Sequence, residues 1–538
     1  MDYYPTVGDP TVEAGRLHGT VAEIAQEAED LMALPEVRGV MLLAYRFVGD
    51  SEEYSCEYPH PGWVDQDINV LNQANLNVLR EVVSESGVDP SSISSLGLST
   101  QRGLHLYVDK DGKVLRNGRG LSWQDARHGE QLDQLRENFG EEAYYRITGL
   151  PISAFWPIGK ILWMQQNEPD EYALAAKILT TQEYFLRQLS DADDWFIDAS
   201  NASLFGLMDV ATLDWDEGLL KLVGVRRDQL PTIVPSGYQV GAVNELTAEF
   251  TGLPAGLPIC TGGGDQQCAG IGAGVIEEGL CEFTFGTAGN SVACLSRPTP
   301  DPQRVITLSV HATPSPVWEA EGIQAAAGAA YRWFRDNIGF LARYIEPFTE
   351  VDAYVLINRL AAKSPPGANG LIFHPYLAGS MTPHYNENAR GGFLGLTLKH
   401  DFGDMARAVL EGVTYEAKEI LDGYEAMGLD LREIRLAGGA TKSELWCQIQ
   451  ADVYGKPTKV LQEGECAVLG AALLGAVGAG IFESVDEGVD QLVHISRTFT
   501  PNPDNHDIYT QMSEAFEKAY HSLKEGGVYK ALTSAQHR

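Results

Sequence analysis

The sequence contains few basic residues for its length. Its 538 residues include 39 Lys and Arg against 74 Asp and Glu, which gives a formal net charge of −35. Such an acidic surface repels nucleic acid and anionic membranes, so we predict neither as a partner. The charge is otherwise explained by a well-solvated acidic surface.

Cysteine and long apolar runs are also scarce. The seven cysteines form no Cys-x-x-Cys pair and no Cys/His cluster with zinc spacing. Their odd number and low density favour a reducing compartment. The first residues contain no basic segment followed by an apolar run, and no stretch reaches the roughly 18 apolar residues of a membrane helix. We therefore expect a cytoplasmic protein.

The length exceeds what one hydrophobic core usually covers, so two domains are expected. Strands alternate with helices along the chain, which predicts an α/β fold. The Gly- and Pro-rich segment 246–258 favours a crossing between domains, with a division into 1–252 and 253–538. The expected strands are 40–48 (paired as a hairpin with 54–58), 93–99, 281–285 and 431–436; the expected helices include 16–32, 69–86, 404–423, 443–454 and 467–480.

Asp265 ends a glycine run, Thr261-Gly262-Gly263-Gly264, that follows an apolar segment. Glycines let the backbone approach a ligand closely, and a carboxylate beside them can take a proton from a substrate hydroxyl. The sequence therefore predicts Asp265 as the base of a phosphoryl transfer. The alternative is a turn Asp that caps the helix beginning at Gln266.

Two further glycine segments are candidates for phosphate and nucleotide binding. Gly286-Thr287 follows the expected strand 281–285, and Gly438-Gly439-Ala440 lies between the strand 431–436 and a helix. Exposed N–H groups at such turns bind phosphate, and Lys442 could add a positive charge. The alternatives are a plain hairpin turn, a tight strand-to-helix turn and a solvated lysine. Neither segment fits a Walker A or Rossmann motif.

Polar and aromatic residues on two loops form a candidate sugar site. Gln101, Arg102, Trp123 and Asp125 supply the amide, guanidinium, aromatic and carboxylate groups that hold hydroxyl-rich ligands. The alternative is a local Arg102–Asp125 salt bridge with Trp123 in the core.

Taken together, these segments resemble the FGGY carbohydrate kinases, a family that includes xylulokinase, glycerol kinase, gluconokinase and the autoinducer kinases. The resemblance covers about 40–520 and is most specific near the C-terminus. It rests on Gly391-Gly392-Phe393-Leu394-Gly395-Leu396 with 404–411, on the adenosine-type motif 436–451, on Glu465-Cys466-Ala467-Val468-Leu469-Gly470-Ala471, and on Pro61-Gly62-Trp63-Val64-Asp65-Gln66-Asp67.

The resemblance implies two actin-like (RNase H-like) ATPase domains that flank a cleft, with ATP and Mg²⁺ as cofactors. It implies Asp265 as general base, Gln266 and Phe155 as substrate contacts, Gly286 and Thr287 as a phosphate loop, and Gly438 to Ala440 beside adenosine. The expected partner is a small-molecule sugar or polyol, with xylulose-like ketoses favoured, and a homodimer is possible.

The sequence departs from the family in three places. The family's Gly-Glu-Arg-Thr-Pro is replaced by Gly379-Ser380-Met381-Thr382-Pro383. Gly103 stands where glycerol kinases carry Glu, and xylulokinases place Met-His at Arg102-Gly103. The N-terminal Asp-x-Gly-Thr motif, which meets Mg²⁺ and the ATP phosphates, is not found: neither 8–11 nor 34–37 supplies it. No metal ligand is therefore assigned. The alternatives are a sugar-binding pseudokinase on the same fold and a natural N-terminus upstream of Met1.

Overall fold

The computed structural model describes residues 40–43 and 56–536. The first half contains a four-stranded sheet in the order β1 (Val40–Leu43), β4 (Ser95–Thr100), β13 (Pro258–Gly264) and β12 (Gln239–Ala242). The strands β1, β4 and β13 are parallel, so their carboxyl ends lie at one edge. This arrangement puts the loop after β4 beside the start of the helix that directly follows β13 at Asp265.

A second sheet in the first half has five strands. Its strand order is β2 (Cys56–Glu57), β3 (Asp65–Asp67), β6 (Arg119–Leu121), β5 (His105–Val108) and β7 (Lys177–Thr180). Of the expected hairpin between 40–48 and 54–58, the turn and most residues lie outside the described ranges. Its described parts, β1 and β2, are edge strands of different sheets, where β1 pairs with β4 and β2 pairs with β3. The predicted helix 16–32 and the rest of the strand 40–48 lie outside the described residues.

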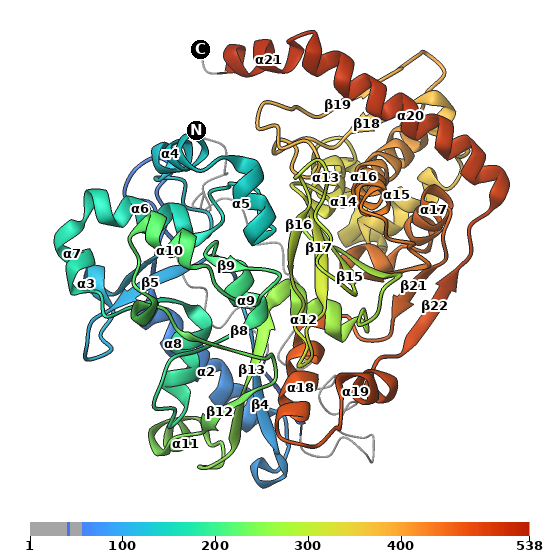
Figure 1. The fold of residues 1–538 in the computed structure, drawn as a ribbon. Coiled ribbons are helices and arrows are strands. Elements are labelled where there is room, and N and C mark those ends of the chain that lie inside the picture. Colours follow the sequence, from blue (N-terminus) through green and yellow to red (C-terminus); the bar gives the residue numbers. More distant parts are fainter. Residues whose placement is uncertain (1–39, 44–55, 537–538) are drawn as a thin grey trace.

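The second half is built on a seven-stranded sheet, drawn on the right in Figure 1. Its order is β16 (Thr307–Val310), β17 (Trp318–Gln324), β15 (Gly289–Leu295), β14 (Leu280–Phe285), β20 (Glu433–Ala437), β21 (Thr458–Leu461) and β22 (Ile495–Phe499). The expected strands 281–285 and 431–436 are therefore confirmed as β14 and β20. The division at 252/253 stays a prediction; β13, which follows it, belongs to the sheet of the first half.

Helices cover these sheets, and several match expectation. The predicted helices 69–86, 404–423 and 443–454 are α2 (Ile68–Glu85), α16 (Phe402–Ala426) and α17 (Glu444–Tyr454). Further helices include α4 (Gly129–Asn138), α5 (Glu141–Thr148), α6 (Pro157–Asn167), α8 (Thr181–Leu189), α13 (Gly328–Asn337), α14 (Phe340–Thr349), α15 (Ala353–Ala361), α19 (Val485–Leu492), α20 (Pro503–Glu525) and α21 (Val528–Gln536). Shorter elements include α9 (Ala199–Ser203), α11 (Glu245–Thr251), β18 (Ile372–His374) and β19 (Gly392–Leu394).

Two helices rich in small residues pack together where the halves meet (Figure 1). These are α12 (Asp265–Gly272) and α18 (Cys466–Gly478), and α18 also contacts β4. A Cβ on Gly272 would overlap the Cys466 carbonyl oxygen, and a Cβ on Gly470 would overlap the Cys268 carbonyl oxygen. The glycines thus bring the two backbones into contact, which confirms the expected small-residue helix at 467–480. Because Asp265 begins α12, this contact also fixes the position of the predicted base.

We expect Gly470→Val to lower the free energy of unfolding by about 3 kcal/mol, because the added atoms meet the rigid backbone of α12. Urea denaturation followed by circular dichroism measures the effect. Gly129→Ala is the matched control, since no heavy atom lies within 4 Å of a Cβ placed there. Equal denaturation midpoints for the Gly470 variant and the wild type would contradict the close packing of α12 on α18.

Candidate active site

The glycine run before Asp265 is required by the packing of β13. A Cβ on Gly262 would overlap the Leu98 carbonyl oxygen in β4, and a Cβ on Gly264 would lie 2.6 Å from Cδ of Arg102. Gly264 is the N-cap of α12 and Asp265 is its first residue, so the alternative of Asp265 as the capping residue is wrong. A carboxylate in the first turn of a helix is stabilised by the helix dipole.

Arg102 connects the predicted base to the second half of the molecule. Its Nε lies 2.8 Å from Oδ1 of Asp265, and its Nη2 donates to Oε1 of Glu321 over 2.7 Å. The Nη1 group donates to the other Glu321 oxygen, so the pair is bidentate. Glu321 lies on β17 and is almost completely buried. The guanidinium is thus held from both sides by carboxylates of different elements.

Glu321 was not among the sequence-predicted site residues. The signal that could have found it is the acidic pair Glu319-Ala320-Glu321 in a strand, because alternate strand residues face the same side and buried acids need partners. Glu319 also has a buried partner, because its Oε2 lies 3.0 Å from Nδ1 of His311.

The surroundings of Asp265 raise its pKa above the ordinary value. Although 41% of its side-chain surface is exposed, the dense protein around it removes water from the carboxylate, which is the largest cause. Arg102 opposes this shift and Glu321 adds to it. The pKa of Arg102 is raised in turn, because the carboxylates outweigh the effect of its burial. The guanidinium therefore stays charged beside the base.

Trp123 and Phe155 form an aromatic wall against Gly103, the residue after Arg102. The rings of Trp123 and Phe155 are stacked, with centroids 6.0 Å apart and planes 14° from parallel. Trp123 is 36% exposed, so the alternative that places it in the core is wrong. Gly103 has φ +74°, and a Cβ there would lie 2.6 Å from the Phe155 carbonyl oxygen. This chain therefore has no room at Gly103 for the Glu of glycerol kinases.

A buried lysine, Lys160, donates hydrogen bonds to the backbone beside this wall. It is fully buried, and its Nζ donates to the carbonyl oxygens of Gly103, over 2.7 Å, and of Phe155, over 3.1 Å. Burial lowers the pKa of Lys160 to about 7. Lys160 thereby ties the loop after β4 to the segment that carries Phe155.

Asp125 does not pair with Arg102. Its side chain has no exposed surface, and Oδ2 accepts from the Val64 N–H and from Nε of Arg127, both over 2.7 Å. Burial acts to raise the pKa of Asp125, but His128, Arg127 and the Val64 N–H together lower it. The expected alternative of an Arg102–Asp125 salt bridge is wrong. A direct sugar contact by Asp125 stays a prediction.

Two glutamines of the candidate site are partly buried: Gln101 directly follows β4, and Gln266 lies in the first turn of α12. The Gln101 carbonyl accepts a hydrogen bond from Oγ1 of Thr181, and the Gln266 N–H donates to Oδ1 of Asp265 over 2.9 Å. Both contacts with Asp265, from Arg102 and from Gln266, engage Oδ1. Their roles toward substrate stay predictions.

The predicted nucleotide segments lie side by side because their strands are neighbours. In the parallel pair β14–β20, Thr284 is opposite Ala437, so both following loops leave the same edge of the sheet. Gly438 has φ +78°, and a Cβ there would lie 2.7 Å from the Phe285 carbonyl oxygen. Ala440 is buried, whereas Gly286 and Thr287 are exposed in the turn between β14 and β15.

The N-terminus of α13 supports this turn. The N–H groups of Gly328 and Ala329 donate to the carbonyl oxygens of Gly286, over 2.8 Å, and of Thr287, over 3.0 Å. The carbonyl groups are thereby turned toward α13.

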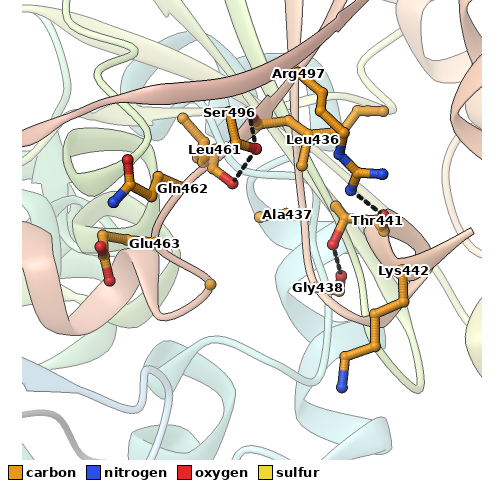
Figure 2. Close-up of a pocket in the computed structure, with 12 residues that line it drawn as sticks. Leu436, Ala437, Gly438, Thr441, Lys442, Leu461, Gln462, Glu463, Ser496 and Arg497 are labelled. Atoms are coloured by element: carbon orange, nitrogen blue, oxygen red, sulfur yellow. Dashed lines mark hydrogen bonds between the residues drawn. The ribbon is translucent and has the colours of Figure 1, made fainter. Parts of the chain in front are cut away.

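A cavity of about 230 Å³ adjoins Gly438 (Figure 2). It lies at the ends of β20 and β21 and the start of β22. Arg497 donates to the Thr441 carbonyl oxygen over 2.6 Å, and the Lys442 side chain extends away from Arg497. Sequence analysis found Gly438 and Lys442 but missed the lining residues Gln462, Ser496 and Arg497, because the strands β21 and β22 were not predicted.

Profiles of the FGGY family of carbohydrate kinases match both halves of the chain. The N-terminal domain of the family matches residues 48–272 and the C-terminal domain matches 283–479. The chain belongs to the FGGY family of carbohydrate kinases. The predicted fold class, α/β with two actin-like ATPase domains, is confirmed. This kinase is an ATP-dependent phosphotransferase with an alcohol group as acceptor.

Individual relatives agree with this assignment. The kinase is 30% identical to a xylulose kinase of Staphylococcus epidermidis over 88% of this chain and 92% of that protein, and 31% identical to an autoinducer-2 kinase of Escherichia coli over 88% and 89%. A solved xylulose kinase of Rhodospirillum rubrum is 27% identical, with a TM-score of 0.78 over 88% of this chain and 93% of that one. Because these relatives are kinases, the pseudokinase alternative is not favoured.

The described residues contain neither a ready-made metal cluster nor a membrane-spanning helix. Across residues 40–43 and 56–536, no group of three or more His, Cys, Asp or Glu side chains is placed to hold a metal ion. In the same part of the kinase, no helix is long and apolar enough to cross a membrane. The segments 8–11 and 34–37, considered for the missing Asp-x-Gly-Thr motif, lie outside the described residues.

Proposed function

We propose that this kinase transfers the γ-phosphoryl group of ATP to a hydroxyl of a ketose, with xylulose favoured. The observation that carries the proposal is Asp265 at the start of α12, beside a charged arginine whose next residue, Gly103, packs against Trp123 and Phe155. The similarity to xylulose kinases supports the choice of ketose. The lack of room for a side chain at Gly103 argues against the glycerol-kinase type of site.

Asp265 acts as the general base in this proposal. The contacts of Asp265 with Arg102 and Gln266 both engage Oδ1, so Oδ2 accepts the hydroxyl proton. The substrate oxygen then forms a bond to the γ-phosphorus as the bond to the bridging oxygen breaks and ADP leaves. Arg102 keeps Asp265 in place and ionised, and the stacked rings of Trp123 and Phe155 orient the sugar.

The residues present fit a bound nucleotide. Gly286 and Thr287 are exposed, and their carbonyl groups are engaged by α13, which leaves the N–H side of the turn for phosphate. Gly438 leaves the backbone bare beside this turn, where a Cβ would fill the space. We assign Gly286 and Thr287 to the phosphates, and Gly438, Gly439, Ala440 and Lys442 to the adenosine side.

We propose Mg²⁺ as the metal cofactor. Mg²⁺ in phosphoryl-transfer sites would be bound through one or two carboxylates and the substrate phosphates. When bound, it neutralises negative charge on the phosphates.

A substrate panel in a coupled ADP-release assay tests the function. The panel contains D-xylulose, other ketoses, glycerol, gluconate and autoinducer-2, each with ATP and Mg²⁺. We expect kcat/KM for xylulose to exceed that for glycerol by at least about 100-fold. A site whose polar groups pair with the substrate hydroxyls discriminates by at least such factors against a ligand that leaves those groups unpaired. The highest kcat/KM for glycerol, gluconate or autoinducer-2 would contradict the proposed substrate while leaving the kinase activity intact.

We also infer that the kinase is a homodimer, in line with the expectation from sequence. Its interface is the subject of the next subsection.

A further inference from the structure

Helix α14 presents an apolar side that the described residues leave uncovered. The helix lies beside α13 and α15 in the second half (Figure 1), and none of its residues is buried. The α14 face consists of the five exposed apolar residues Phe340 (54% exposed), Leu341 (63%), Tyr344 (72%), Ile345 (41%) and Phe348 (79%). Their spacing places all five on one side of a helix.

The size of this face matches an interface between proteins. Five large side chains exposed to this degree present roughly 600 Å² of apolar surface, at the upper end of the largest patch on a typical monomer. If two copies meet through the same face, both patches are buried, about 1,200 Å² in total. That value reaches the lower limit for stable protein interfaces.

The local charge favours a second copy of this chain as the partner. The whole chain carries −35, so two copies repel each other over most of their surface. The segment 328–363, which includes α14, contains five basic and four acidic residues, a net charge of +1. Two copies that meet here bring together apolar surfaces that carry almost no net charge, so charge repulsion between them is small at this contact. The same overall charge disfavours an anionic membrane as the occupant.

We propose that the α14 face is the homodimer interface, with a second copy of this chain docked on it in an isologous, two-fold arrangement. This inference deepens the homodimer included in the proposed function. It does not depend on the identity of the sugar. Tyr344 and Phe348 are the most exposed residues of the face and form its centre of contact.

Sedimentation velocity of the full chain from about 1 to 100 µM tests the interface. The variants are Tyr344→Glu and Phe348→Glu, and the control is Leu246→Glu, an equally exposed leucine on α11. We expect a wild-type dimer and a control dimer of the same affinity. Each α14 variant weakens dimerisation at least about 100-fold, because a carboxylate is desolvated at the contact. Added NaCl strengthens the wild-type dimer by screening the acidic surfaces.

Two results would overturn the proposal: a wild-type chain that stays monomeric at 100 µM in high salt, or α14 variants that dimerise as tightly as the wild type. Thermal unfolding of each variant checks that it is folded. The same samples are assayed for ADP release, and kcat of the α14 variants should stay within about twofold of the wild type, since α14 is outside the catalytic machinery. Failure of the interface is thereby distinguished from failure of the proposed function.

Discussion

Replacing Asp265 with Asn should lower kcat for sugar-dependent ADP release by roughly 10²- to 10⁴-fold, the contribution expected of a general base. The amide keeps the shape of the carboxylate but cannot take the hydroxyl proton. It also keeps an oxygen for the contact with Arg102. A coupled assay at saturating sugar and ATP measures kcat.

The matched control is Asp133→Asn, a change at an exposed acid in α4. Its kcat should equal that of the wild type. Calorimetry should show that the Asp265 variant still binds sugar, and circular dichroism that it is folded. If the Asp265 variant retained wild-type kcat, Asp265 could not be the base. If the wild type bound sugar but released no ADP, the pseudokinase alternative would return.

Replacing Arg102 with Gln should reduce kcat/KM by at least about 100-fold and move its acidic limb to higher pH. Arg102 lowers the pKa of Asp265, so without the guanidinium this pKa rises further and the base is protonated over a wider pH range. Glu321 also loses its buried partner, which costs about 3 kcal/mol of stability. The pH profile of kcat/KM and urea denaturation measure the two effects.

Glu321→Gln provides a control of opposite sign. Glu321 raises the pKa of Asp265, so its neutralisation should move the acidic limb of kcat/KM to lower pH. A general loss of folding would not shift the two profiles in opposite directions. Profiles that move together, or not at all, would show that Arg102 and Glu321 do not act through the ionisation of Asp265.

Local patterns in the sequence were enough to predict many elements and the candidate base. Periodic apolar residues indicated α2, α16 and α17, and glycines after strands indicated the turns at Gly286 and Gly438. These features depend on residues a few positions apart, whose conformational preferences are set by local sterics. Asp265 was found for the same reason, because its glycine run is contiguous. Its catalytic role stays a prediction.

The partners of the site residues could not be predicted in this way. The alternative interpretation of the sequence pairs Arg102 with Asp125, 23 residues away, yet Arg102 binds Glu321, 219 residues away on a strand of the other half. Asp125 instead turns inward to Arg127 and the Val64 N–H. Salt-bridge choice depends on which loops the sheet order brings together, and sequence distance carries no information about that order.

The sequence by itself determined the composition, the family motifs and the glycine-flanked position of Asp265, since these are properties of contiguous residues. The tertiary structure alone decided that β1 pairs with β4, that α18 packs against α12, and that Arg102 is held between Asp265 and Glu321. Each of these contacts joins distant segments. Close packing stabilises them, because this arrangement of the sheets buries apolar faces and gives buried charges such as Glu321 a partner.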